Sequence, residues 1–388
     1  MKKTIAILGS TGSIGKNLIK IIEKNFNDFK VELLSTNKNY KDLYKQAIKL
    51  NVKNIIINDE NSYKLALKNK LNRKIEIHNS FNCFNKIFNK KIDYAMSSIT
   101  GLDGLKPTLD IIKYTKTIAI ANKESIICGW NLILKKIKKN KVNFIPVDSE
   151  HFSIWYATKH IKTNIDKIVL TASGGPFFNL PLSKFKDIKI SQTLKHPNWR
   201  MGKKISVDSA TMMNKVFEII EAKKIFDIEY KDLSILIHPK SYIHAIVKFS
   251  DGIIKLIAHD TDMKIPIQNT LYNGFSKKIK IKTKKIDIKK LNNLNLCTVN
   301  KKKFPFVDII KNMPNKTSLY ETVLVSANDE YVKQYLNNSI KFTDIHSKLL
   351  KFIKKKEFAK YKRISPKNIK DIIKVNNYVR MKISLKSI

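Results

Sequence analysis

Asp148 and Glu150 are carboxylates whose type and spacing indicate chemistry. They follow the apolar run 142–147, which predicts a buried strand, and a strand that continued to Glu150 would turn both side chains to one side. Two carboxylates this close repel each other, which favours a bound cation. Hard oxygen ligands without a Cys or His pair indicate Mg²⁺ or Mn²⁺ rather than zinc. A capped helix start would use the same residues, and this alternative stays open.

A second polar cluster lies downstream, in a stretch whose apolar residues recur with the period of a helix. Asp208 or Ser209 is expected to cap the N terminus of this helix. The cap hydroxyl, the Asn214 amide, the Lys215 ammonium group and the unpaired N–H groups of the first turn together suit a phosphate group. Glu218 lies one turn further, within reach of a metal ion at such a site. The alternative is an ordinary amphipathic helix with a solvated polar face.

The segment 173–204 is predicted to form a lid over this site. Residues 178–195 are polar and interrupted by Pro, and residues 196–204 have no apolar period. Ser173, in the small-residue turn that opens the segment, could donate to a phosphate oxygen. Trp199 would cover the substrate, because its polar flanks argue against the alternative of packing in the core.

The N terminus carries a strand, a glycine turn and a helix in direct succession. The strand 4–8 runs into Gly9-Ser-Thr-Gly-Ser-Ile-Gly15, and helical spacing continues through residues 16–24. Glycines at such a turn let the backbone approach a pyrophosphate at the helix N terminus. The spacing is GxxGxxG rather than GxGxxG, which leaves a plain turn as the alternative, but the position after the first strand favours dinucleotide binding.

The turn after the second predicted strand, 31–34, bears on the choice of nucleotide. It contains no Asp or Glu that could bind the ribose diol of NAD. Lys38, with Thr36 and Asn39 beside it, suits a 2′-phosphate instead. The sequence therefore favours NADP over NAD, with a plain polar loop as the alternative.

Strands and helices alternate through the first 147 residues, which predicts a doubly wound parallel sheet and an α/β fold class. Asn122, Lys123 and Glu124 lie at the carboxyl end of one strand, where ligands bind in such sheets. A helix N-cap with a Glu in the first turn is the alternative. The strands are expected at 4–8, 31–34, 54–57, 74–77, 93–99, 117–121 and 142–147, and the helices at 16–24, 41–50, 62–70, 81–88, 102–113 and 130–139.

The rest of the chain predicts a mixed α+β region followed by helices. The run 277–290 alternates Lys and Ile but changes phase, which indicates an irregular edge or linker strand. From Phe306 the apolar period is helical to the end. Strands are expected at 167–171, 233–237, 245–249 and 253–258, the last two as a hairpin through Ser250-Asp-Gly252, and a helix at 265–272.

The chain of 388 residues has a formal net charge of +43 and three scattered Cys. Its length predicts two or three domains, and the Cys spacing suits a reducing cytosol. The N-terminal apolar run is too short for a signal sequence or a membrane span, so we expect a cytoplasmic protein without a membrane partner. The positive charge is spread along the chain with few interleaved aromatic residues, which favours an anionic small substrate over a specific nucleic acid.

These motifs closely resemble those of the 1-deoxy-D-xylulose 5-phosphate reductoisomerase family, the NADPH enzymes of the non-mevalonate isoprenoid route. The resemblance runs nearly end to end, and the block 196–215 is its most specific part. It rests on residues 9–15, 121–125, 147–151, 171–177, 196–202, 205–215 and 326–328.

The resemblance implies a role for each matching residue. The catalytic set would be Asp148, Glu150, Glu218 and Lys123, and the first three would hold the divalent metal, Mg²⁺ or Mn²⁺, with Co²⁺ as a further candidate. NADPH would contact Gly9, Thr11, Gly12, Ser13, Ile14, Asn37, Lys38, Asn39, Asn122, Glu124 and, from the lid, Gly202. The phosphorylated sugar would meet Lys123, Ser149, Glu150 and Glu218 at its oxygenated backbone, Ser173, His196, Ser209, Asn214 and Lys215 at its phosphate, and Trp199 and Met201 on the lid.

The resemblance also implies a homodimer and a two-step reaction. 1-Deoxy-D-xylulose 5-phosphate would be rearranged and then reduced to 2-C-methyl-D-erythritol 4-phosphate. The expected domains are a Rossmann-like NADPH domain at 1–147, a catalytic domain with the lid at 148–275, a linker at 276–300 and a helical domain at 301–388. Val216-Phe217 stands where the family usually has Gly-Leu, and we expect local repacking there. Asn37 stands where a Gly is common, and Asn tolerates a positive φ better than most residues.

Two other functions stay open at this point. An NADP-dependent dehydrogenase of a phosphorylated hydroxy acid would share the first domain but needs no site of three carboxylates and no long lid. A basic nucleic-acid-binding protein would use the positive charge and would bind DNA or RNA in a salt-sensitive way.

Overall fold

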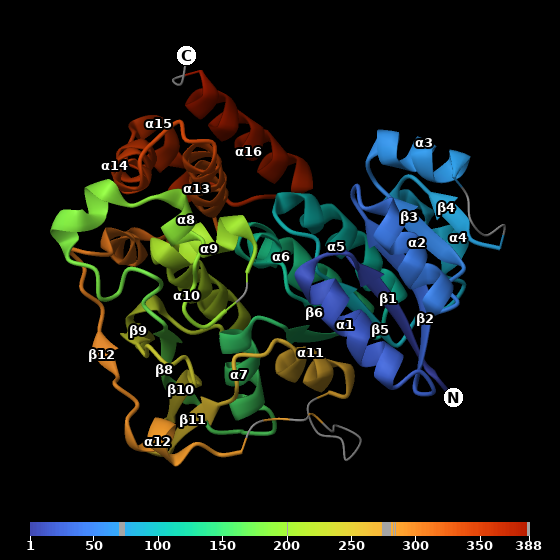
Figure 1. Cartoon of the computed structure of the whole chain (residues 1–388), viewed down its shortest axis with the longest axis horizontal. Coiled ribbons are helices and arrows are strands. Elements are labelled where there is room, and N and C mark those ends of the chain that lie inside the picture. Colours follow the sequence, from blue (N-terminus) through green and yellow to red (C-terminus); the bar gives the residue numbers. More distant parts are fainter. Residues whose placement is uncertain (70–73, 200, 274–280, 282, 284, 386–388) are drawn as a thin grey trace. The chain divides into compact units, whose positions relative to one another are not determined.

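The computed structural model describes residues 1–69, 74–199, 201–273, 281, 283 and 285–385. The chain forms two compact units, whose strands and helices are labelled in Figure 1. The first unit consists of Met1–Ser125, Asn131–Phe152 and Asp262–Lys282, and the second of Ile126–Trp130, Ser153–Thr261 and Thr283–Ile388.

The first unit is built on a seven-stranded sheet in which all neighbouring strands are parallel. The strand order is β4-β3-β2-β1-β5-β6-β7, so the order reverses between β1 and β5. Such a switch point is where doubly wound sheets bind ligands. The predicted fold class is confirmed. The strands are β1 Lys3–Leu8, β2 Phe29–Thr36, β3 Asn54–Ile57, β4 Glu76–His78, β5 Tyr94–Ser97, β6 Thr117–Ile120 and β7 Asn143–Pro146.

Helices pack on this sheet through apolar faces. Leu18 and Ile22 of α1 are fully buried in the same core as Ile267 and Leu271 of α11. Helix α11 therefore packs with the first unit, although it falls inside the range 148–275 expected for the catalytic domain. The helices are α1 Ser13–Lys24, α2 Tyr40–Lys49, α3 Glu60–Lys68, η1 Phe81–Cys83, α4 Phe84–Ile87, η2 Leu102–Gly104, α5 Leu105–Ile111, η3 Ile112–Tyr114, α6 Lys123–Asn140 and α11 Lys264–Leu271.

The second unit contains a mixed five-stranded sheet in the order β11-β10-β8-β9-β12. β8 and β9 are parallel, and the other pairs are antiparallel. The predicted hairpin between β10 and β11 is confirmed, and Gly252 at its turn has the positive φ of +87° that favours glycine. The strands are β8 Ile165–Ala172, β9 Leu233–Ile237, β10 Ile243–Phe249, β11 Ile254–Ala258 and β12 Cys297–Thr298.

Helices form the rest of the second unit, and Figure 1 shows α13, α14, α15 and α16 gathered together in orange and red. The helical period predicted from Phe306 is thereby confirmed. The elements are α7 Ser149–Thr158, which starts in the first unit, η4 Leu182–Asp187, α8 Ile190–Thr193, α9 Lys203–Ala210, α10 Met213–Phe226, η5 Tyr230–Asp232, α12 Ile288–Asn292, η6 Pro305–Asn312, α13 Tyr320–Leu336, α14 Phe342–Ile353, α15 Lys356–Ala359, η7 Lys360–Arg363 and α16 Ile369–Ser384.

The helix predicted to begin at Asp208 or Ser209 is two helices, so this prediction is wrong. Both residues lie inside α9, and the chain breaks at Met212, whose φ of +65° is left-handed. The Thr211 hydroxyl accepts a hydrogen bond from the Met213 N–H at 3.4 Å, which helps to start α10. A helical wheel assumes one continuous helix and cannot register such a break.

Two further expectations concern irregular segments. The predicted lid contains the short helices η4 and α8. Residues 277–280, 282 and 284 of the predicted edge strand 277–290 lie outside the described residues, and α12 occupies the C-terminal end of this range. Among the helices of the described ranges, none combines the length and hydropathy that a bilayer crossing requires.

Candidate active site

The glycine turn after β1 is shaped by close backbone contacts. Gly9 has a φ of +87°, and a Cβ added there would lie 2.9 Å from the backbone of Ser98. A Cβ on Gly15 would lie 2.4 Å from the Gly9 carbonyl oxygen. Gly12 caps α1 without any side chain, so the first N–H groups of the helix have no side-chain cap. This turn can therefore hold an anionic pyrophosphate on backbone donors.

Three further predicted nucleotide residues, Thr11, Ser13 and Ile14, belong to this turn. Ser13 is exposed in the first turn of α1, and Ile14 packs partly buried against the core. The Thr11 hydroxyl lies 2.6 Å from the Thr36 hydroxyl at the end of β2. A hydrogen bond of this length fixes the glycine turn against the neighbouring strand.

The turn after β2 presents polar side chains to solvent. Asn37, Lys38 and Asn39 are all exposed, and Asn39 caps α2 by accepting from the Asp42 N–H. The Lys38 side chain is 74% exposed and lies 3.9 Å from Asp59, too loosely paired to be neutralised. Asn37 is not among the residues with positive φ, so it fits this turn without the strain that a missing Gly would suggest.

Asn122, Lys123 and Glu124 form the start of α6. The Asn122 side chain accepts from the Ser125 N–H at 2.6 Å and donates to the Gly101 carbonyl at 2.7 Å. The helix-cap alternative is therefore confirmed for Asn122, and any contact with a cofactor would come from its backbone. All three residues are buried, and Lys123 turns towards Asp148.

Asp148 and Glu150 lie at the start of α7 rather than on a strand. β7 ends at Pro146, so the expectation that strand alternation aligns the two carboxylates is wrong, and the capped helix start is confirmed. The Asp148 carboxylate accepts from the Glu150 N–H at 3.3 Å, which satisfies a donor of the first helical turn. Ser149 lies between them, and its hydroxyl bonds Glu150 at 2.6 Å.

The charge of Asp148 is held by its neighbours. Burial alone would raise the pKa of this carboxyl, but the Lys123 ammonium group at 3.4 Å and a hydrogen bond with His151 at 3.2 Å outweigh it. The pKa of Asp148 therefore lies below its ordinary value. A carboxylate that stays ionised next to a second one is a fit donor set for a hard divalent cation.

In the second unit, Ser173 and His196 form a hydrogen-bonded pair. His196 Nδ1 accepts from the Asn198 and Trp199 N–H groups at 3.1 and 3.0 Å, so in the neutral ring the proton sits on Nε2. This Nε2–H donates to the Ser173 hydroxyl at 3.0 Å, which also accepts from the Gly175 N–H at 3.0 Å. With two donors pointing at its oxygen, Ser173 can direct its own O–H to a phosphate.

The turn that carries Ser173 lies directly against α9. Gly175 has a φ of +67°, and a Cβ there would lie 2.9 Å from the Ser209 carbonyl oxygen. The glycine thus permits the close approach that brings the Ser173 turn to the last turn of α9. Ser209 is half-buried at this contact.

Lys215, Glu218 and Glu221 of α10 are buried and Asn214 is half-buried, so the alternative of a solvated polar face is wrong. Glu218 is 1% and Lys215 is 5% exposed. Lys215 forms an ion pair with Glu218, and the Asn214 amide donates to the same carboxylate. A buried carboxylate flanked by an ammonium group and an amide suits a site that takes both a cation and a phosphate.

The predicted lid residues lie close to α9. Trp199 is half-buried and meets His244 edge to face, with ring centroids 6.1 Å apart. Met201 is half-buried, and Gly202 is exposed at the N-cap of α9. His244, buried on β10 and stacked on His259 at 3.7 Å, was not predicted. The sequence feature that could have pointed to His244 is its position as a polar residue in an otherwise apolar strand.

Family models match three successive parts of the chain. Residues 5–129 match the model described as 1-deoxy-D-xylulose 5-phosphate reductoisomerase. Residues 144–226 match the C-terminal domain of that enzyme, and residues 259–382 match the DXP reductoisomerase C-terminal domain.

Two curated relatives bear the name 1-deoxy-D-xylulose 5-phosphate reductoisomerase. The protein of Pelagibacter ubique is 59% identical over 389 residues, covering 100% of both chains. The protein of Wolbachia pipientis from Culex pipiens is 37% identical over 377 residues, covering 96% of this chain and 95% of its own.

Solved structures agree with this similarity. The reductoisomerase of Zymomonas mobilis in complex with NADPH is 30% identical, with a TM-score of 0.87, over 100% of this chain and 99% of its own. A DOX-P reductoisomerase in complex with NADPH, fosmidomycin and magnesium is 27% identical, with a TM-score of 0.89, over 99% and 98%.

Proposed function

Since this chain belongs to the 1-deoxy-D-xylulose 5-phosphate reductoisomerase family, we propose that it converts 1-deoxy-D-xylulose 5-phosphate to 2-C-methyl-D-erythritol 4-phosphate. The reaction uses NADPH and a divalent cation, Mg²⁺ or Mn²⁺, with Co²⁺ as a further candidate. The observation that carries the proposal is the buried polar face of α10, where Asn214, Lys215 and Glu218 meet. A simple dehydrogenase has no need of such a face.

NADPH binds at the switch point of the parallel sheet. The turn 9–15 holds the pyrophosphate on backbone N–H groups, since its glycines exclude side chains there. The exposed Lys38 ammonium group binds the 2′-phosphate, with Asn37 and Asn39 beside it. Thr11, Ser13, Ile14, Asn122, Glu124 and Gly202 complete the contacts with the cofactor.

The divalent cation binds Asp148, Glu150 and Glu218. Glu150 lies in the first turn of α7, and Glu218 is a buried residue of α10. The family to which the chain belongs supports their assignment as ligands. Three carboxylates give a hard oxygen ligand set without Cys or His, which Mg²⁺ and Mn²⁺ prefer.

The substrate is held by its phosphate while its other end reacts. Ser173, His196, Ser209, Asn214 and Lys215 grip the phosphate, and Trp199 and Met201 close over it. The phosphate takes no part in bond making, so this grip supplies binding energy that orients the reacting carbons. Closure of the lid excludes water from the reacting carbons.

When bound, the cation supplies Lewis acidity for the rearrangement and NADPH supplies the reducing equivalents. The protein's own part is positioning and charge. Lys123 keeps Asp148 ionised, and it also lies where it can meet a substrate oxygen together with Ser149. Lys215 forms an ion pair with Glu218 from one turn earlier on α10.

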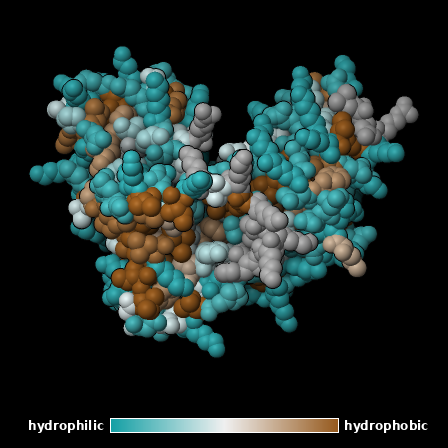
Figure 2. Space-filling model, turned by 60° about the horizontal axis from the view of Figure 1, so that its bottom comes forward, coloured by the Kyte–Doolittle hydropathy of each residue, from teal (hydrophilic) through white to brown (hydrophobic). Residues whose placement is uncertain are grey.

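We further propose that the enzyme is a homodimer that forms through the edge strand β11. Figure 2 shows hydrophobic side chains gathered in a patch on the face of the second unit that carries β11 and α12. Ile254 and Leu256 are 53% and 46% exposed on β11, and Ile288 is 66% exposed on α12. An open apolar edge of this kind pairs readily with a second copy of itself. Sedimentation velocity of the wild type against Leu256→Lys, with Leu65→Lys on α3 as the control, tests the dimer.

The dependence on NADPH and the three free cysteines suit the reducing cytoplasm. Product analysis tests the proposed reaction. Incubation with 1-deoxy-D-xylulose 5-phosphate, NADPH and Mg²⁺ should give a product with a branched carbon skeleton in its ¹³C NMR spectrum. A product reduced at the carbonyl without rearrangement would favour the dehydrogenase of a phosphorylated hydroxy acid instead.

A further inference from the structure

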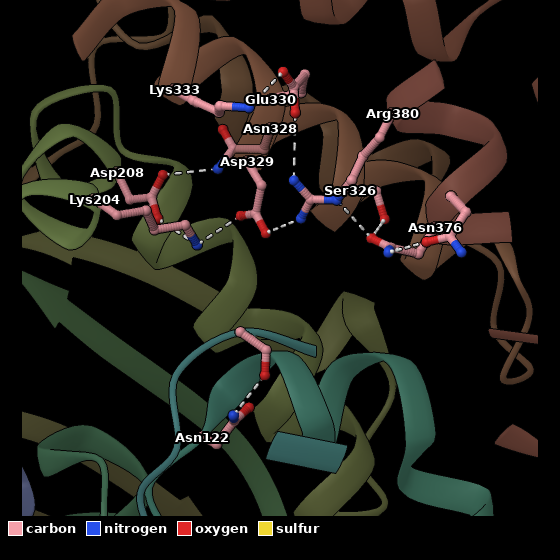
Figure 3. Close-up of polar contacts among 12 residues, drawn as sticks. Asn122, Lys204, Asp208, Ser326, Asn328, Asp329, Glu330, Lys333, Asn376 and Arg380 are labelled. Atoms are coloured by element: carbon pink, nitrogen blue, oxygen red, sulfur yellow. Dashed lines mark hydrogen bonds and ion pairs between the residues drawn. The ribbon is translucent and has the colours of Figure 1, made fainter. Parts of the chain in front are cut away.

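Buried polar contacts with the C-terminal helices hold helix α9, which carries Ser209, in place (Figure 3). The Asp208 carboxylate is 1% exposed and accepts from the Asn328 amide of α13 at 2.8 Å. The Lys204 ammonium group, one turn earlier on α9, pairs with the same carboxylate at 2.9 Å. Asp208 is thus fixed from two sides, and Ser209 is the next residue.

The contacts continue from α9 through α13 to α16. Lys204 also pairs with Asp329 at 3.1 Å, and Asp329 pairs with Arg380 of α16 at 3.0 Å. Arg380 in turn donates to Asn376 at 2.9 Å, and Asn376 accepts from the Ser326 hydroxyl at 2.8 Å. Figure 3 shows this chain of contacts running from one helix to the next.

Helix α13 holds α10 as well. Lys224, in the last turn of α10, pairs with Glu321 at the start of α13 at 2.9 Å, and both side chains are almost fully buried. His346 of α14 lies next to the backbone of Thr211, between α9 and α10. The segment with the proposed phosphate residues thus lies between anchors that all belong to the C-terminal helices.

The nature of these contacts matters for their role. Buried ion pairs and amides add little net stability compared with apolar packing of the same volume, because their desolvation is costly. Their hydrogen-bond geometry, however, fixes directions that apolar contacts leave loose. A site that must place a hydroxyl within a fraction of an ångström of a phosphate oxygen benefits from such fixed directions.

We propose that Asn328 is a positioning residue for the phosphate end of the substrate. It acts through Asp208, whose carboxylate it orients, and thereby sets the last turn of α9 and the Ser209 hydroxyl. The inference rests on the proposed function, because it assumes that Ser209 contacts the substrate phosphate.

The test is Asn328→Leu, which keeps the side-chain volume but removes the donor to Asp208. KM for 1-deoxy-D-xylulose 5-phosphate should rise about tenfold, and so should the inhibition constant of inorganic phosphate, while kcat and the Kd of NADPH change less than about twofold. Should Asn328→Leu fail to fold, Lys204→Met removes the other donor from a residue that is one third exposed and should give the same split.

Ser326→Ala is the matched control. Ser326 is as buried as Asn328 and lies two residues before it, but its hydroxyl bonds Asn376 of α16 and not α9. This variant should lower Tm without changing KM or the phosphate inhibition constant. An unchanged KM in Asn328→Leu, or an equal rise in Ser326→Ala, would overturn the proposal. Calorimetric titration with inorganic phosphate needs no turnover, so it tests the positioning even if the proposed reaction fails.

Discussion

We propose that the nucleotide turn of the first unit and the α9–α10 region of the second unit each bind an anion, and the two regions are built differently. The turn 9–15 works by lacking side chains, and its donors are backbone N–H groups. The α9–α10 region works through buried charged side chains such as Lys215 and Glu218. We expect cofactor binding at the first region to be sensitive to added side-chain atoms, and the second region to be sensitive to the loss of a charge. Substitutions that add bulk or remove charge should therefore separate the two regions.

The largest effect should come from removing a charge in the second region. Glu218→Gln replaces a carboxylate with a neutral amide, which is a poor ligand for a hard cation, so kcat should fall on the order of 10³-fold. The Kd of NADPH, measured by fluorescence titration, should stay within about twofold. Glu229→Gln, at a carboxylate 60% exposed, is the control and should keep full activity. An unchanged kcat in Glu218→Gln would remove the metal site from this account.

The free energy of unfolding should depend on pH through His346 of α14, which lies next to Thr211 in the α9–α10 region. Burial lowers the pKa of His346 from 6.5 to about 4. The unfolded chain therefore takes up the proton first, so the stabilisation is complete above pH 6.5 and is lost as the pH falls from 6.5 towards 4. The loss should be on the order of 3 kcal/mol in chemical denaturation. His346→Gln should flatten this dependence, and equal pH slopes in both proteins would contradict the prediction.

In the nucleotide turn, an added side chain should destabilise the fold at Gly15 but not at Gly12. Gly15→Ala would place Cβ 2.4 Å from the Gly9 carbonyl oxygen, so it should destabilise the fold by about 1–3 kcal/mol. At Gly12 the nearest atom to an added Cβ is 3.4 Å away, and Gly12→Ala should keep its Tm but bind NADPH more weakly. If both variants melt alike, the crowding at Gly15 is not what shapes the turn.

The smallest effect should concern the choice between nicotinamide cofactors. Lys38 is exposed and is the cation at the position where a 2′-phosphate is read. Lys38→Ala should weaken NADPH binding about tenfold and leave NADH binding unchanged. Lys41→Ala, at an exposed lysine on α2, is the control. Equal losses for both cofactors would show that Lys38 does not read the 2′-phosphate.

The nucleotide turn and the α9–α10 region also differ in how well the sequence predicted them. The glycine turn, β3 and β9 were predicted at or near their observed bounds, because strand periods and glycines are local signals. The break between α9 and α10 was missed, since the left-handed residue there is Met212 rather than Gly or Asn. The contact of Asp208 with Asn328 joins residues 120 positions apart, and no local pattern carries it.

Two site predictions were wrong in local structure. Asp148 and Glu150 were expected on a strand, yet Asp148 supports the first turn of a helix, as a short carboxylate at that place commonly does. Ser209 was expected as a helix cap but lies in the last turn of α9. The sequence could supply candidate residues for the chemistry, whereas the contacts that position these residues depend on packing between distant segments.

The central claim is that a dinucleotide site and a metal-dependent sugar phosphate site act together in one reaction. The most direct test follows the absorbance of NADPH with purified protein and 1-deoxy-D-xylulose 5-phosphate, first with Mg²⁺ and then with a chelator. We predict oxidation of NADPH that stops on chelation and resumes when Mg²⁺ is restored. Oxidation that continues in the chelator, or no oxidation by folded protein that binds NADPH, would contradict the account.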